Sequence, residues 1–158
     1  MPKEKLQYNR VLLKLSGELF GAKDGHGINF SAFEEIAEAL INIRDKTKVE
    51  LAIVIGGGNI FRGRDKAEDV DEATADYMGM LATIINGMGL QEALERLGAP
   101  TRMMTAIEVK AVAEPYIRRK ALKHLNKGRI VILTAGTGNP FFTTDSGAAL
   151  RAAELRCD

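Results

Sequence analysis

The strongest constraint on the fold is a set of short, continuous apolar runs, each followed closely by glycine. Residues 11–15, 51–55 and 130–133 read VLLKL, LAIVI and IVIL. Strands that are apolar at nearly every position, rather than at alternate ones, are typical of a parallel sheet covered on both faces. The runs are far shorter than the ~20 residues that a membrane-spanning helix needs. The sequence therefore predicts interior strands of a parallel sheet.

Helical patterns separate these strands. Ser31 and Glu34 form a candidate capping box, and the apolar residues that follow are spaced for one helix face. A longer helix is expected over residues 70–97, where glycines imply either close packing or a break near Gly87. The buried stripe predicted for this helix consists of Tyr77, Leu81, Ile84, Ile85 and Met88.

The second half of the chain continues the alternation. Residues 101–106 are expected to form a strand, Pro115 to open a helix that continues to about residue 125, and Asp145 to cap the last helix. Strands and helices then alternate along the chain. This order predicts an α/β fold, a three-layer αβα sandwich with a mostly parallel central sheet.

Composition narrows the class of protein. The chain has 158 residues, a length that suits one domain, with 46% apolar and 27% charged residues. A net charge of +1 gives no basic excess for binding nucleic acid or an anionic membrane. Cys157 is the only cysteine, so no internal disulfide is possible, and the charged N-terminus does not resemble a signal peptide. A cytoplasmic location is the expectation.

Glycine-marked turns follow three of the strands, at residues 14–17, 56–58 and 136–138. The carboxyl ends of parallel strands meet at one edge of a sheet, so the three turns are expected to border one crevice. Glycines there leave backbone N–H groups open to a phosphate. Together with Lys14 and Arg62, they predict a site for a multiply charged anion. Phosphoryl transfer needs such fixed positive charge and N–H donors.

Standard phosphate motifs are missing, and each feature alone has an ordinary structural explanation. No glycine is followed by lysine, so there is no Walker A loop, and neither glycine cluster completes G-x-G-x-x-G. Lys14 could reach solvent from an edge strand. Arg62 and Asp76 could be surface residues, Asp145 could only cap a helix, and residues 141–142 (Phe-Phe) could belong to the core. The functional interpretation depends on their combination.

Four segments carry a resemblance to a known family. They are LLKLSGE at 12–18, VIGGGNIFRG at 54–63, DYMGMLAT at 76–83 and ILTAGTGNPFFTTDSGAALRA at 132–152. In register over nearly the whole chain, they resemble the bacterial uridylate kinases, a branch of the amino acid kinase superfamily. The GTGNPFFTTD run is the segment specific to that branch, whereas KLSG and GGG mark only the superfamily. The resemblance implies an amino acid kinase fold and transfer of the ATP γ-phosphoryl group to UMP, with Mg²⁺ accompanying ATP and no protein-held metal cage.

The resemblance also implies roles for individual residues. Catalytic roles fall to Lys14, Arg62 and Asp145, of which Asp145 would orient Lys14 or the metal. ATP would meet Lys14, Leu15, Ser16, Gly17, Gly58 and Arg62. UMP would meet Gly57, Asp76, Thr137, Gly138, Asn139, Pro140, Phe141, Phe142, Thr143 and Thr144, with Asp76 holding the ribose. The family segment linked to activation by GTP corresponds to Ala22, Lys23, Asp24, Gly25, His26 and Gly27. UTP would inhibit, and the family forms homo-oligomers, hexamers built from dimers.

One departure from the family concerns length. Family chains continue well past residue 158 into a part that holds the adenine and ribose of ATP, so the chain is expected to be the N-terminal, acceptor-binding part of the fold. The strand at 130–133 would then have an unpaired edge. Two alternatives stay open: a carboxylate or carbamate kinase of the same superfamily, and a catalytically silent nucleotide-binding or assembly module.

Overall fold

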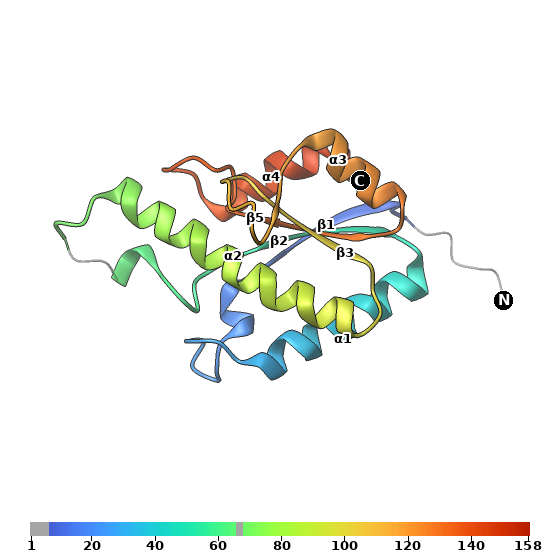
Figure 1. Cartoon of the computed structure of the whole chain (residues 1–158), viewed down its shortest axis with the longest axis horizontal. Coiled ribbons are helices and arrows are strands. Elements are labelled where there is room, and N and C mark those ends of the chain that lie inside the picture. The colour runs from blue at the N-terminus through green and yellow to red at the C-terminus, as the bar shows by residue number, and fades with distance from the viewer. Residues whose placement is uncertain (1–6, 66–67) are drawn as a thin grey trace.

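A wholly parallel sheet forms the centre of the molecule (Figure 1). The structure is a computed structural model that describes residues 7–65 and 68–158. Within them the sheet has five strands in the order β1-β2-β5-β3-β4. These are β1 (Arg10–Leu15), β2 (Glu50–Ile55), β3 (Thr101–Thr105), β4 (Glu114–Pro115) and β5 (Ile130–Thr134).

Helices cover both faces of this sheet. In Figure 1, α1 (Phe30–Thr47) and α2 (Glu72–Arg96) lie below it, and α3 (Arg118–Asn126) and α4 (Thr144–Glu154) lie above it. Two short 3₁₀ turns, η1 (Gly17–Phe20) and η2 (Gly63–Asp65), follow β1 and β2. The predicted three-layer α/β architecture is confirmed. Among residues 7–65 and 68–158, no helix combines the length and the apolar character needed to cross a bilayer.

The strands are continuously apolar because each face of the sheet has its own core. In β2, Leu51, Ile53 and Ile55 join the cluster beneath α1 and α2, whereas Ala52 and Val54 join the cluster beneath α3 and α4. Successive side chains of a strand point to opposite faces, so a strand covered on both sides has no polar position.

The edges of the described sheet are β1 and β4, not the strand that the sequence analysis expected to be unpaired. The strand at 130–133 was expected to have an unpaired edge, but β5 lies between β2 and β3. Within the described residues β1 pairs only with β2. The backbone N–H and C=O of Arg10 on the outer side of β1 bond to Asp158, each at 2.9 Å. Lys14 therefore lies on an edge strand.

Helix starts differ from the predicted ones. The N-cap of α1 is Asn29, whose side chain accepts from the N–H of Ser31 at 3.1 Å, so the predicted box at Ser31 is wrong. The helix after Pro115 begins only at Arg118, because Pro115 lies in the two-residue edge strand β4. Proline, which lacks an N–H, suits an edge strand. The cap of α4 is Thr143, and Asp145 lies in the first helical turn.

The long helix α2 exposes most of the stripe that was predicted to be buried. Ile84 is buried, but Tyr77, Leu81, Ile85 and Met88 are 43–47% exposed. Residues 77–90 of the helix carry no charged side chain on any side, so apolar spacing alone does not identify its inward face. It continues unbroken through Gly87, where an added Cβ would lie 2.6 Å from Met103 Sδ. The close-packing explanation of this glycine is therefore confirmed.

Candidate active site

The turns after β1 and β2 pack backbone against backbone. Gly56 N–H donates to the carbonyl of Leu15 at 2.9 Å. A Cβ on Gly17 would lie only 2.5 Å from the backbone nitrogen of Gly58, a separation that no side chain tolerates. The glycines thus permit a close approach of two strand ends, which brings the first two predicted turns together.

Gly57 extends this packing to α2. An added Cβ at Gly57 would lie 2.7 Å from the Cβ of Ala82 and 3.0 Å from the backbone nitrogen of Thr83. At Gly58, by contrast, the nearest atom to an added Cβ is the Nε of Arg62 at 3.8 Å. Gly57 is therefore required for helix packing, whereas the space beside the Cα of Gly58 is open.

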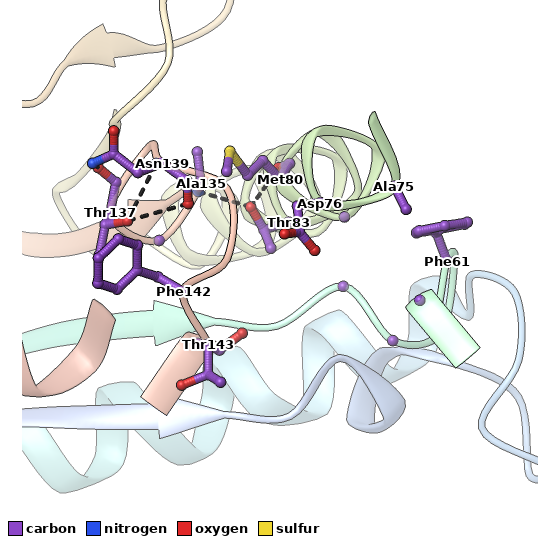
Figure 2. A pocket seen from close by; sticks show the side chains of 16 residues that line it. Phe61, Ala75, Asp76, Met80, Thr83, Ala135, Thr137, Asn139, Phe142 and Thr143 are labelled. Atoms are coloured by element: carbon purple, nitrogen blue, oxygen red, sulfur yellow. Dashed lines mark hydrogen bonds between the residues drawn. The ribbon is translucent and has the colours of Figure 1, made fainter. Parts of the chain in front are cut away.

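An open cavity of about 380 Å³ lies between this turn, the first half of α2 and the segment after β5 (Figure 2). Small-molecule sites typically measure roughly 300–1,000 Å³. The lining residues are Gly57, Gly58, Phe61, Gly63, Ala75, Asp76, Gly79, Met80, Thr83, Ala135, Gly136, Thr137, Asn139, Phe142, Thr143 and Thr144. The last two lie at the start of α4, whose N-terminal N–H groups and dipole favour an anion.

Asp76 connects two walls of the cavity. Its Oδ2 accepts the backbone N–H of Phe141 at 2.7 Å, which ties the 137–144 segment to α2. Phe141 has a φ of 69°, and its side chain and that of Phe142 are 70% and 61% exposed. The interpretation of these phenylalanines as core residues is wrong. Phe142 instead lines the cavity on the side opposite Phe61 (Figure 2).

Lys14 and Asp145 form an ion pair beside the cavity, with 3.4 Å between Nζ and Oδ1. Their side chains are 40% and 82% exposed, so Lys14 is not buried as the predicted interior strand over residues 11–15 implied. The edge position of β1 lets the side chain reach solvent, as the alternative explanation proposed. Such an exposed pair adds little to folding stability and leaves both charges accessible to a ligand.

Arg62 is less exposed than a surface arginine. Its side chain is 16% exposed, its Nε donates to the carbonyl of Gly58 at 2.7 Å, and its Nη2 lies 3.0 Å from Glu18 Oε1. These contacts use two nitrogens of a guanidinium that carries five N–H donors. Arg62 is thus held rigidly against the turn while donors stay available. The sequence reasoning did not single out Glu18.

A buried amide pair ties the 22–27 loop to the same turn. Asn59 Nδ2 donates to the carbonyl of Gly27, and Gly27 N–H donates to the carbonyl of Asn59, both at 2.8 Å. Asn86 is 0% exposed; its Nδ2 donates to Asn59 Oδ1 at 2.7 Å and to the carbonyl of Gly56 at 2.8 Å. Sequence reasoning missed both asparagines: Asn59 follows the conspicuous glycines of the turn after β2, and Asn86 lies within a largely apolar stretch of α2.

Comparison with known proteins agrees with this architecture. Residues 9–158 match the model of the Amino acid kinase family. The chain belongs to the amino acid kinase family. It is similar to the crystal structure of UMP kinase from Bacillus anthracis, with 45% identity and a TM-score of 0.90, and to that of UMP kinase from Ureaplasma parvum, with 39% identity and a TM-score of 0.88.

These likenesses cover most of this chain but only part of the relatives. The matches cover 96% of this chain in both cases, and 62% and 64% of the Bacillus and Ureaplasma chains. The chain therefore spans less than two thirds of the length of these amino acid kinase relatives.

The predicted site residues divide into two neighbouring groups in this amino acid kinase fold. Most of those assigned to UMP line the cavity; Gly138, Pro140 and Phe141 do not. Of those assigned to ATP, only Gly58 lines it, while residues 14–17 and Arg62 lie on the adjoining turn. The sequence analysis placed the turn containing Gly136 at the crevice but missed Phe61, Gly63, Ala75, Gly79, Met80, Thr83 and Ala135. Of these, Phe61 and Gly63 stood within the quoted 54–63 motif, next to Arg62.

Proposed function

We propose that this chain is the UMP-binding part of a UMP kinase, which transfers the ATP γ-phosphoryl group to UMP and forms UDP. The observation that carries the proposal is that Gly57, Asp76 and the 137–144 segment border the same cavity at the carboxyl ends of the strands. The 45% identity with a UMP kinase over 96% of the chain supports the same assignment.

The proposed roles follow the chemistry of each group. Asp76 keeps one carboxylate oxygen for a ribose hydroxyl while the other holds Phe141. The 137–144 segment surrounds the uracil. The turn at Gly58, the guanidinium of Arg62 and the ammonium of Lys14 stabilise the negative charge on the transferring phosphoryl group.

Magnesium is proposed to accompany ATP rather than to occupy a site built only from protein groups. Mg²⁺ in kinases is held by substrate phosphates, with one or two carboxylates and water completing its shell. Asp145 fits that demand, because its carboxylate is 82% exposed beside Lys14. Among the described residues there is no cluster of three or more His, Cys, Asp or Glu side chains able to hold a metal ion. When bound, Mg²⁺ neutralises charge on the phosphate oxygens.

Assembly and regulation are further proposals. Four half-exposed, uncharged side chains form a row on α2: Tyr77, Leu81, Ile85 and Met88. This row supports a homo-oligomer, since a helix segment that is apolar on all sides is normally covered by other protein. The bonds between Gly27 and Asn59 support a link from the 22–27 loop, the proposed GTP segment, to the turn after β2. UTP inhibition, residues 1–158 as one domain and the cytoplasmic location stay predictions.

Titration calorimetry of the chain with UMP tests the proposal. We expect UMP to bind, and glutamate, aspartate and carbamate to bind at least 100-fold more weakly. Asp76→Ala should weaken UMP binding at least tenfold, equivalent to about 1.4 kcal/mol. Binding of a carboxylate or carbamate in preference to UMP would refute the assignment and favour the alternative kinases of the superfamily.

A coupled assay for UDP then tests catalysis. If ATP and Mg²⁺ yield UDP, Lys14→Met should lower turnover by at least 100-fold without changing the UMP dissociation constant, because Lys14 lies outside the cavity. Full activity of Lys14→Met would remove Lys14 from the mechanism. If UMP binds without any turnover, these 158 residues are a binding module.

A further inference from the structure

The turn after β5 is held in an unusual backbone conformation. Ala135 has a φ of 64°, and Gly136 and Gly138 have φ values of 53° and 78°. Left-handed geometry is common for glycine but unfavourable for alanine. Ala135 is nevertheless fully buried and lines the cavity together with Gly136. Other groups must therefore hold this turn in place.

Thr83 on α2 holds the N–H side of the turn. Its Oγ1 accepts from the backbone N–H of Ala135 at 2.8 Å and donates to the carbonyl of Met80 at 2.6 Å (Figure 2). The bond to Met80 fixes the direction of the hydroxyl hydrogen, so a lone pair faces Ala135. Thr83 is 7% exposed, and its hydroxyl is already engaged on both sides. Its polar group thus serves the protein backbone rather than a ligand.

Arg151 on α4 holds the carbonyl side. Its Nη2 donates to the carbonyl of Gly136 at 3.2 Å, and its Nη1 donates to Glu154 Oε1 at 2.8 Å. Its guanidinium carbon lies 3.9 Å from the ring centre of Tyr116, whose hydroxyl donates to Glu154 Oε2 at 3.0 Å. Arg151 is 7% exposed. The ion pair, the ring contact and burial leave this guanidinium little freedom to move.

We propose that Thr83 on α2 and Arg151 on α4 are positioning residues that together clamp the turn at residues 135–136. The clamp selects the left-handed conformation that decides which backbone groups of the 136–139 segment face the bound nucleotide. This inference rests on the proposed function, because it assigns the turn to UMP recognition. The Thr83 hydroxyl and the Arg151 guanidinium act on the turn through its backbone groups.

The matched pair Thr83→Val and Thr83→Ser tests the clamp. Valine keeps the shape and loses both hydrogen bonds, whereas serine keeps the hydroxyl. UMP affinity measured by calorimetry on the folded chain should fall at least 30-fold in Thr83→Val and stay within threefold in Thr83→Ser. A merely structural role would lower the melting temperature and leave the UMP affinity of the folded protein unchanged, which would overturn the proposal.

Amide hydrogen exchange provides a readout that is independent of UMP. We expect exchange in residues 135–139 to accelerate at least tenfold in Thr83→Val, with exchange in α1 unchanged. If the wild type does not bind UMP, the proposed function fails while exchange still decides the clamp. Should Thr83→Val not fold, the same measurements are made on Arg151→Lys, which lacks the planar guanidinium that bonds to both Gly136 and Glu154. Unchanged exchange in the 135–139 segment would overturn the clamp.

Discussion

Replacing Asn86 by alanine tests how the turn after β2, at residues 56–58, is held. Asn86 is completely buried, and its side chain hydrogen-bonds to the carbonyl of Gly56 and to the side-chain amide of Asn59. Alanine removes the donor to Gly56 and both contacts to Asn59. Asn59 Nδ2 retains its bond to the carbonyl of Gly27. The substitution therefore deprives the buried Gly56 carbonyl and the Asn59 side-chain oxygen of the hydrogen bonds that Asn86 donates.

The expected cost follows from those groups. A buried polar group deprived of its partner costs about 1–3 kcal/mol, so Asn86→Ala should lower the free energy of unfolding by about 3 kcal/mol. For a chain of this length that corresponds to a fall in melting temperature of about 6–12 °C. Asn42→Ala is the matched control: Asn42 is exposed on α1, and surface changes of this kind stay within about 0.5 kcal/mol.

Urea unfolding monitored by circular dichroism measures both variants, and a double-mutant cycle with Asn59→Ala isolates the amide pair. Because the two side chains share hydrogen bonds, the cycle should yield a coupling energy of about 1–2 kcal/mol. A loss below about 1 kcal/mol in Asn86→Ala, or strictly additive effects of the two substitutions, would refute the claim that this pair holds the turn.

Three other predictions concern the turn and the α4 network. Gly57→Ala should lower the free energy of unfolding in urea by about 1–3 kcal/mol, because the added Cβ would clash with α2. Gly58→Ala is the control: the nearest atom to its added Cβ lies at 3.8 Å, so this variant should unfold like the wild type. Arg62→Ala should cost about 1 kcal/mol, mostly from the lost bond to the Gly58 carbonyl, since Glu18 is half-exposed; an unaltered urea midpoint would contradict this. Burial and the hydrogen bond to Glu154 raise the pKa of Tyr116 to about 12 from the ordinary 10, so the folded protein holds this proton more tightly and loses stability as pH rises from 10 to 12. Tyr116→Phe should remove about 1–2 kcal/mol of that alkaline loss, and an identical pH dependence in both proteins would argue against the assigned environment.

The sheet was predictable because its strands carry the signal of double-sided burial. Residues 51–55 and 130–133 are apolar at every position, and both lie between helical layers. Their carboxyl ends then had to meet at one edge, so the convergence of the glycine turns followed from strand direction alone. Local patterns therefore sufficed for the architecture and for the location of the cavity.

Strand order was not predictable from the same patterns. The run at 11–15 resembles the central strands, yet β1 pairs only with β2 among the described residues, while β5 has neighbours on both sides. Whether a strand is central depends on pairing partners distant in sequence, which local hydropathy does not contain. That difference reversed the expected environment of Lys14, and it leaves β1 and β4, rather than β5, at the edges of the described sheet.

The residues that hold the site in shape are the hardest to find in a sequence. Glycine turns are conspicuous because only glycine permits the contact, as between Gly17 and Gly58. Thr83 and Asn86 are inconspicuous, because their partners are backbone groups of the turns after β5 and β2. Nearly every residue type carries such backbone groups, so the sequence does not show which of them a side chain binds. A buried threonine or asparagine within an otherwise apolar helix must satisfy its polar atoms. Once the pairing of the strands is known, a buried polar residue on a helix beside the strand ends shows which turn that helix holds. On α2, Asn86 holds the turn after β2 and Thr83 holds the turn after β5.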